Sequence, residues 1–124
     1  MLITIDSADP RPLYLQVADG IKELIARDKL SEGAPLPPVR QLAADLGVNL
    51  NTIAAAYREL QKDGLIAIKH GSGCFIASRT TDRRTDDLLR PLRTALTELI
   101  LAGVSPLKIM DMVAHELNFV GKAR

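Results

Sequence analysis

The chain has 124 residues, which suits one domain, or one small domain with an appendage. Hydrophobic residues make up 47% of it but aromatic residues only 3%, and Trp is absent, so the core must be built from Leu, Ile, Val and Ala; this composition favours helices over an all-β sandwich. With 16 basic and 15 acidic residues the charge is nearly balanced, and the strongly basic character of many nucleic-acid binders is excluded.

The sequence has no feature of a disulfide-bonded, membrane-spanning or secreted protein. Its single cysteine, Cys74, excludes an intramolecular disulfide and a cysteine-based zinc cluster. The longest apolar stretches are far shorter than the roughly 18 residues that a membrane span needs. The first residues, MLITIDSADP, have neither the basic region nor the long apolar region of a signal peptide. We therefore expect a cytoplasmic protein without a membrane partner.

The first predicted elements are a short edge strand at residues 2–5 and a helix from Pro12 to about Asp28. Gly20 inside this helix costs about 1 kcal/mol relative to Ala, which leaves two interpretations open: close packing against another segment, or simple tolerance. Residues 31–38 (SEGAPLPP) then break the regular structure. The apolar residues that define the helix by their spacing are Leu13, Val17, Ile21, Leu24 and Ile25.

A helix-turn-helix is predicted between Pro38 and Gly64. Gly47 is placed to end the first helix in the left-handed conformation, and Asn49 or Asn51 is placed to cap the second. Each helix carries one apolar stripe at spacing i, i+3, i+4 and i+7, which predicts that both pack onto a common core. The two stripes are Val39, Leu42, Ala43 and Leu46, and then Ile53, Ala56, Tyr57 and Leu60.

The outer face of the second helix has the side chains expected of a DNA-reading helix. In such a unit the N-terminal residues of the second helix meet base edges in the major groove. Asn51 is able to pair with adenine through two hydrogen bonds, and Thr52 to contact a phosphate or a thymine methyl group. Arg58 and Lys62 lie farther along the helix and are expected to meet phosphates. The alternative interpretation of Asn51 and Thr52 is that they are solvated residues at a helix start.

A β-hairpin is predicted after this helix. Residues 65–69 and 74–78 are β-type runs that flank a Gly-rich tip, His70-Gly71-Ser72-Gly73. A helix-turn-helix followed by such a ribbon is the winged-helix order, and a tip of little bulk is suited to approach the sugar-phosphate backbone. His70 has the alternative interpretation of a polar turn residue. Cys74 is interpreted as a small hydrophobic residue, with redox sensing as the alternative.

Residues 79–87 are polar and charged, and predict a linker or the entry to a helix. The helix that follows runs to about Ala102, with Gly103 as its stop. Pro91 leaves two starts open: the helix begins near Arg90, or it begins earlier and is kinked at Pro91. In either case the C-terminal part of the chain is predicted to be helical.

A last helix is predicted from Ser105, its N-cap, to about Asn118. Two short helices with apolar residues on more than one side cannot bury them alone, whereas a self-complementary two-fold interface does. The residues expected to form this dimer interface are Leu96, Leu99, Ile100, Ile109, Met110, Val113 and Leu117.

No catalytic constellation is found. Asp111 and His115 have the i, i+4 spacing of metal ligands, but no further His or Cys lies nearby, so a surface pair is the expected interpretation. The sequence has no P-loop, no GxSxG and no HExxH motif. We therefore expect no enzyme activity, no metal and no cofactor.

At family level the chain closely resembles the N-terminal domain of the GntR family of bacterial transcription regulators. The resemblance covers about residues 10–77 and rests on PLYLQVADGIKELI, LPPVRQLA, GVNxNT, AYRELxxDGLI and HGSG, in this order. It implies a winged helix that binds double-stranded DNA, with Arg40, Asn49, Asn51 and Thr52 at the first and second helices of the motif, and His70 and Gly71 at the wing tip. Leu50 departs from the pattern, because many members carry Arg there and the short-tailed branch often carries Pro.

The length of the tail resembles the YtrA-like branch of this family, since only 46 residues follow Ser78. We therefore expect an α+β, mostly helical fold, with a winged helix-turn-helix in residues 1–78 and a two-helix dimerisation segment in residues 79–124. The resemblance implies a homodimer that binds a palindromic operator, more often as a repressor. Two alternatives stay open: a regulator that also binds a small effector at the tail, and a winged-helix module for protein contacts.

Overall fold

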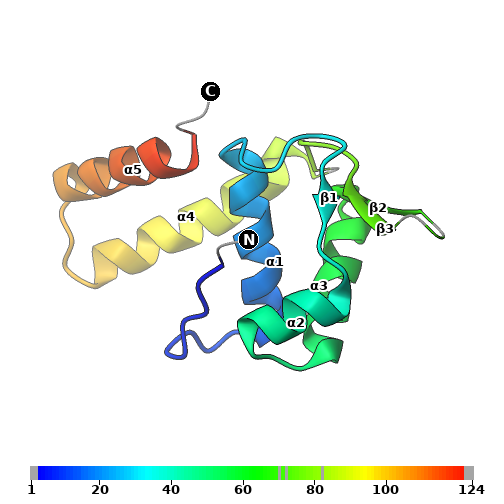
Figure 1. Cartoon of the computed structure of the whole chain (residues 1–124). Helices are drawn as coiled ribbons and strands as arrows, with labels where there is room; N and C mark the ends of the chain where they lie inside the picture. Colours follow the sequence, from blue (N-terminus) through cyan, green and yellow to red (C-terminus); the bar gives the residue numbers. More distant parts are fainter. Residues whose placement is uncertain (1–2, 70, 72, 82, 122–124) are drawn as a thin grey trace. The chain divides into compact units, whose positions relative to one another are not determined.

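The structure is a computed structural model and describes residues 3–69, 71, 73–81 and 83–121. The chain divides into two compact units, Met1–Thr81 and Asp82–Arg124. Helices with one small antiparallel sheet make an α+β, mostly helical fold, as expected. The elements are α1 (Leu13–Ala26), β1 (Pro35–Leu36), α2 (Val39–Leu46), α3 (Leu50–Lys62), β2 (Ile66–Lys69), β3 (Gly73–Ile76), α4 (Thr85–Leu101) and α5 (Pro106–Val120) (Figure 1).

The core of the first unit lies where the apolar stripes of its helices meet. Helices α1 and α2 both pack against α3, and strand β2 of the sheet also contacts α3. The buried residues of these elements form one core cluster. Full burial of each aliphatic side chain contributes about 1.5–3 kcal/mol relative to an exposed one. The fully buried aliphatic residues include Val17, Ile21, Leu42, Ile53, Leu60 and Ile76.

The predicted helix-turn-helix is confirmed, and its ends are set by local geometry. Gly47 follows α2 with a φ of 68°, a left-handed conformation that a residue with a Cβ adopts only with strain. The N–H of Val48 then donates to the carbonyl of Ala43 at 3.0 Å, which closes the helix end. Helix α3 is capped by Asn49, whose Oδ1 accepts the N–H of Asn51 at 2.7 Å. The cap is therefore Asn49, and Asn51 lies inside the helix.

The predicted hairpin is also confirmed, but it belongs to a three-stranded sheet of order β1-β3-β2. Both neighbours of β3 are antiparallel to it, with Leu36 and Ile68 opposite Cys74. The composition of residues 31–38 predicts only a break in regular structure, yet β1 lies within this segment. Because Pro35 has no N–H to donate, it is suited to the edge of a sheet, which is where β1 lies.

The prediction of an edge strand at residues 2–5 is wrong for the part of it that the structure describes, residues 3–5, which have no strand conformation. Ile3 packs against the core instead, above Gly20 of α1. A Cβ on Gly20 would lie 2.8 Å from Cγ2 of Ile3, a distance that real Cβ atoms essentially never show. Of the two interpretations of Gly20, close packing is therefore the correct one.

In the second unit α4 begins at Thr85, so the earlier of the two predicted starts is correct and Pro91 lies inside the helix. The helix ends before Gly103, which has a φ of 91°. Helix α5 begins as predicted: Oγ of Ser105 accepts the N–H of Lys108 at 3.2 Å, and Pro106 occupies the first helical position. Among the described residues, no helix has both the length and the apolar character needed to cross a bilayer.

Candidate nucleic-acid interface

The outer face of α3 presents polar side chains that have no partner among the residues that the structure describes. Asn51 and Arg58 are exposed, and neither side chain makes a hydrogen bond or an ion pair with another described residue. Thr52, next to Asn51, is half-buried, and Ala55 lies between these residues and Arg58 without adding bulk. The opposite face of α3 is the buried apolar stripe. The helix therefore offers free donors and acceptors on one side only.

The capping bond at the start of α3 distinguishes the two asparagines of the predicted interface. Asn49 is exposed, but its Oδ1 already accepts the N–H of Asn51 at 2.7 Å. Its side-chain NH2 group is left as a donor. The side chain of Asn51 keeps both its acceptor and its donors. Since pairing with adenine uses one acceptor and one donor of an amide, Asn51 is the better suited of the two, because the oxygen of Asn49 is held in the capping bond.

A hydrogen bond between Tyr57 and Pro37 connects α3 to the start of α2. Tyr57 is buried on the inner face of α3, and its hydroxyl donates to the carbonyl oxygen of Pro37 at 2.7 Å. Burial raises the pKa of the Tyr57 phenol, which keeps it protonated and able to donate. Pro37 directly precedes Pro38, the N-cap of α2. The bond therefore holds the first turn of α2 in place relative to α3.

Arg40 lies in this first turn of α2. Its side chain is exposed and makes no ion pair with any residue that the structure describes. No side chain caps α2, so the N–H groups of its first turn have no side-chain acceptor. The sequence predicts Tyr57 only as a core residue, and its role in holding this turn is a finding of the structure. The available signal was a Tyr in an otherwise aliphatic stripe, because a buried tyrosine hydroxyl usually has a hydrogen-bond partner.

The wing has the backbone freedom that its glycines predict. Gly71 and Gly73 have φ values of 78° and 99°, and a Cβ at either position would meet open space. Lys69, at the end of β2, lies with its Nζ 5.3 Å from the centroid of the Phe75 ring, which keeps a positive charge beside the tip. The predicted contact of His70 falls on a residue outside those that the structure describes.

Ion pairs engage part of the acidic side chains of a domain whose formal charge is −1. Residues 1–78 contain 8 basic and 9 acidic residues. Four of the acidic residues form ion pairs with three cations: one cation precedes α1, one lies on α1 and one follows the wing. By contrast, Arg40, Arg58 and Lys62 make no ion pair with a described residue. The pairs are Asp9 and Asp19 with Arg11, Asp63 with Lys22 at 2.9 Å, and Asp28 with Arg79 at 3.2 Å.

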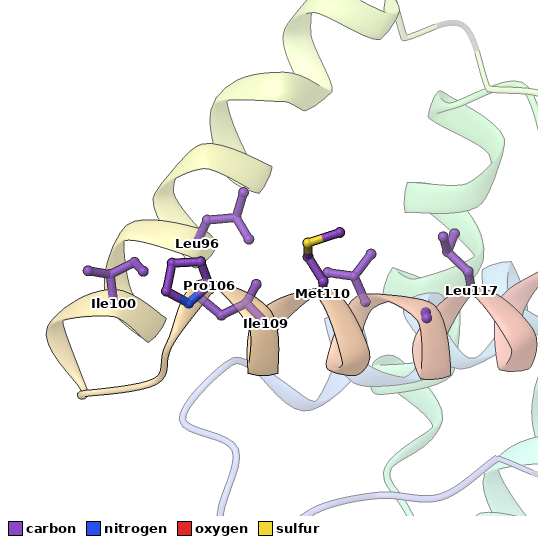
Figure 2. A pocket seen from close by; sticks show the side chains of 8 residues that line it. Leu96, Ile100, Pro106, Ile109, Met110 and Leu117 are labelled. Atoms are coloured by element: carbon purple, nitrogen blue, oxygen red, sulfur yellow. The ribbon is translucent and has the colours of Figure 1, made fainter.

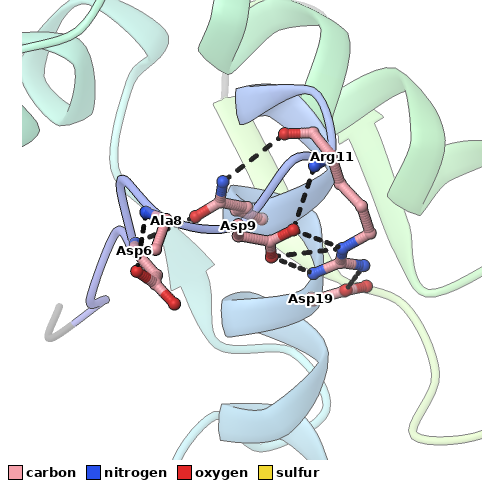
Figure 3. A network of polar contacts seen from close by, with 6 residues as sticks. Asp6, Ala8, Asp9, Arg11 and Asp19 are labelled. Atoms are coloured by element: carbon pink, nitrogen blue, oxygen red, sulfur yellow. Dashed lines mark hydrogen bonds and ion pairs between the residues drawn. The ribbon is translucent and has the colours of Figure 1, made fainter.

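The network around Arg11 holds the N-terminal segment on α1 (Figure 3). The Arg11 guanidinium contacts Asp9 at 3.0 Å as well as Asp19, and its hydrogen bonds hold the pKa of Asp9 below its ordinary value. Gln16, a buried polar residue of α1, accepts the N–H of Asp6 at 3.0 Å through Oε1. These ion pairs are exposed and screened by solvent, so they orient the segment more than they stabilise the fold.

The second unit has an apolar groove between α4 and α5, with a volume of about 500 Å³ (Figure 2). Six of the seven residues predicted to form a dimer interface line it, and the seventh, Leu99, does not. Met110 is 69% exposed and Leu117 is 64% exposed, whereas Ile109 is buried. The residues that line the groove are Leu96, Ile100, Pro106, Ile109, Met110, Val113, Ala114 and Leu117.

The remaining candidate residues lie away from this groove and from the outer face of α3. Cys74 is half-buried and packs against the core, and burial raises the pKa of its thiol, which disfavours the reactive thiolate. Asp111 and His115 are both exposed on α5. No cluster of three or more potential metal ligands occurs within the described part of the chain.

A helix-turn-helix with a two-stranded wing and a polar outer face on its second helix defines a winged-helix DNA-binding protein. Residues 13–76, more than half of the chain, match the family described as "Bacterial regulatory proteins, gntR family". The chain belongs to this family of transcriptional regulators, and it is YtrA-like.

Two relatives from Bacillus subtilis match almost the whole chain. One is the uncharacterized HTH-type transcriptional regulator YhcF, 33% identical over 86% of this chain and 84% of its own. The other is the HTH-type transcriptional repressor YtrA, 30% identical over 90% of this chain and 89% of its own. Since both matches extend well beyond the winged helix, the relatives share the helical tail. These relatives are regulators rather than enzymes.

Two solved structures carry the same fold. A transcriptional antiterminator from Listeria monocytogenes has a TM-score of 0.85 at 28% identity, covering 98% of this chain and 93% of that chain. The DNA-binding domain of AraR, solved in complex with operator ORX1, has a TM-score of 0.55 at 26% identity, covering 62% of this chain and 96% of that domain. The second of these structures has the domain on double-stranded DNA.

Proposed function

We propose that this regulator is a homodimeric transcriptional repressor, which binds a palindromic operator through α3 and pairs through the α4–α5 groove. The observation that carries the proposal is the face of α3 on which the exposed Asn51 and Arg58 make no hydrogen bond or ion pair with another described residue. Exposed polar side chains of this kind bond to water in the free protein and are available to exchange these bonds for those of a ligand. The AraR domain bound to its operator and the repressor YtrA support DNA as the ligand and repression as the outcome.

Each side chain of the interface has a role that follows from its position. Asn51 pairs with adenine through its free acceptor and donor, and Thr52 contacts the backbone or a thymine methyl group beside it. Arg58, two turns farther along α3, meets a phosphate. Asn49 donates one hydrogen bond through its NH2 group, because its oxygen caps the helix. Among the polar side chains of the interface, Asn51 therefore contributes most to the choice of base.

The first turn of α2 is suited to bind a phosphate of the DNA backbone. Its N–H groups have no side-chain cap, and the exposed Arg40 adds a full positive charge at the same helix end. The hydrogen bond from Tyr57 to Pro37 keeps this turn in position relative to α3. We propose that this contact sets the angle at which α3 enters the major groove.

The wing completes the interface on a second side of the DNA. Gly71 has no side chain to obstruct the backbone of the duplex, and Lys69 is positively charged next to it. We propose that the tip, including His70, contacts the sugar-phosphate backbone or a minor groove next to the bases read by α3. Weakening this contact lowers the affinity for all sequences alike.

Dimerisation is proposed from the exposed apolar surface of the second unit. In the single chain Met110 is 69% exposed and Leu117 is 64% exposed, and only Ile109 of this surface is buried. A pair of helices that leaves this much apolar surface in water is expected to be covered by a partner. A second copy provides the same apolar groove, so the two bury one another across a two-fold axis. Two winged helices related by such an axis read half-sites about 10 base pairs apart.

The DNA-binding part is tested by selecting bound sequences from a random duplex library and measuring band shifts at low salt. Asn51→Ala is expected to cost about 1–3 kcal/mol and to relax the preference at one base pair of each half-site. Arg58→Ala is the matched control: it weakens binding to all sequences alike and reduces the salt dependence by about one counterion. Absence of any shift at low salt contradicts the proposal.

The dimer is tested by light scattering on the variant Met110→Glu/Val113→Glu, which places two charges in the groove. Monomers with weak operator binding are expected, because a charge inside an apolar interface is costly to desolvate. His115→Glu adds a charge to an exposed position of α5 that does not line the groove, and it is expected to leave the dimer unchanged. Unchanged dimers in the double variant refute this interface.

The groove also favours a second candidate function, the binding of a small apolar effector. Its volume of about 500 Å³ lies within the range of small-molecule sites, about 300–1,000 Å³, and its lining is almost entirely apolar. An effector that binds the native protein raises the unfolding temperature with concentration. A thermal-shift screen of hydrophobic metabolites tests for such an effector. An effector that takes the place of a second copy in the groove also lowers the mass measured by light scattering to that of a monomer.

A further inference from the structure

Leu50 is an exposed apolar residue on the DNA-reading helix. It is the first residue of α3, directly between the cap Asn49 and the base-reading candidate Asn51. Its side chain is 36% exposed, and among the described residues of α3 it is the one large apolar side chain that the core does not bury. Ile53, one turn later, is fully buried, and Leu50 is not among the residues that form the core or pack against it.

The position of Leu50 limits what it is able to contact on DNA. First-turn residues of a reading helix lie against base edges in the major groove. A leucine offers no donor and no acceptor, so it cannot exchange hydrogen bonds with a guanine, cytosine or adenine edge. The one apolar group that base pairs expose in the major groove is the 5-methyl group of thymine. Contact with it removes apolar surface from water on both sides.

We infer that Leu50 is a specificity-determining residue that selects thymine in each half-site by contact with the 5-methyl group. The inference rests on the proposed function, since it needs α3 in a major groove. Consecutive residues of a helix point about 100° apart, so Leu50 and Asn51 reach different bases. The half-site therefore contains a thymine contacted by Leu50 close to an adenine paired with Asn51. A side chain with a hydroxyl group or a charge at residue 50 is expected to abolish the preference for this thymine.

The test replaces thymine by uracil, which removes the methyl group and leaves every hydrogen-bonding atom in place. Operators obtained by selection with the wild-type protein are resynthesised with one thymine of each half-site changed to deoxyuridine, one position at a time. Burial of one methyl group predicts that affinity falls about fourfold for one half-site and about 15-fold when both carry the change. The dissociation constants are measured by fluorescence anisotropy.

The same series is measured with Leu50→Ala and with two control variants. In Leu50→Ala the uracil penalty at the sensitive position is expected to fall below about twofold, because the methyl group has lost its partner. Leu50→Met keeps an apolar side chain and retains the penalty. Ile68→Ala truncates another exposed apolar residue, 51% exposed on β2, and also retains it. Circular dichroism checks that each variant folds. We expect that they do, because the side chains of Leu50 and Ile68 are exposed and their truncation leaves no cavity in the core.

The outcomes separate this inference from the proposed function. If no DNA sequence is selected by the wild-type protein, the proposed function fails and the inference fails with it. If sequences are selected but contain no thymine whose uracil version binds more weakly, Leu50 does not select thymine and the proposed function stands. If the uracil penalty is the same in Leu50→Ala, another residue contacts the methyl group, and the inference is overturned.

Discussion

Replacing Tyr57 with Phe isolates the bond that holds the two helices of the motif together. The ring stays in the core, and the only loss is the hydroxyl that donates to the Pro37 carbonyl at 2.7 Å. That carbonyl is left without its donor in a half-buried position, which costs about 1 kcal/mol, at the low end of the range of about 1–3 kcal/mol for unsatisfied groups. For a unit of this size, about 1 kcal/mol lowers the unfolding temperature by roughly 4–8 °C.

The chain has one other tyrosine, which makes the control. Tyr14 of α1 is half-buried and makes no hydrogen bond with another described residue, so Tyr14→Phe is expected to change the unfolding temperature little. Both variants are melted by circular dichroism at one protein concentration, because the proposed dimer would make the transition concentration-dependent. Tyr57→Phe should also bind operator more weakly, since the first turn of α2 is held less firmly. Equal melting temperatures for the two variants would show that the bond has no energetic role.

Two further predictions follow from contacts that join distant segments. Gly20→Ala is expected to lower the free energy of unfolding, because the new methyl group meets Cγ2 of Ile3 at 2.8 Å. In an Ile3→Ala background the same substitution should raise the free energy of unfolding by about 1 kcal/mol, through the higher helix propensity of Ala. Both are measured by urea unfolding, and a gain in both backgrounds contradicts the close packing. Burial raises the pKa of the Cys74 thiol, so its reaction with a disulfide reagent at pH 8 should be slower in the native protein than in the urea-unfolded protein. The reaction of the native protein should become faster as the pH rises. Equal rates in the native and unfolded protein would contradict the burial.

The helices of the winged domain and their ends were predictable because they depend on neighbours along the chain. The spacing of Ile53, Tyr57 and Leu60 already defines one buried face, since helical periodicity alone places them on one side. Gly47 ends α2 because only glycine adopts a φ of 68° without strain. The wing follows in the same way from two β-type runs around a Gly-rich tip. Such features involve segments of four to fourteen residues and need no knowledge of the rest of the fold.

Other features depended on residues far apart in sequence, and only the tertiary structure decided them. Strand β1 exists because Leu36 pairs with Cys74, and two residues with a proline carry no strand pattern of their own. The interaction of Tyr57 with Pro37 spans 20 residues, so sequence spacing gave no indication of it. Ile3 lies over Gly20 and not in a strand because its apolar side chain is buried there against α1.

The amino-acid sequence by itself determined the family, the helix-turn-helix, the wing and the side chains that face outward from α3, since each depends on local periodicity, capping or an ordered motif. The tertiary structure decided which of those side chains are free. The oxygen of Asn49 accepts the capping bond, and the carboxylate of Asp63 pairs with Lys22 and not with Arg40 or Arg58. The physical reason is that a hydrogen bond or an ion pair forms only at a distance of about 3 Å, and folding alone brings residues 22 and 63 that close.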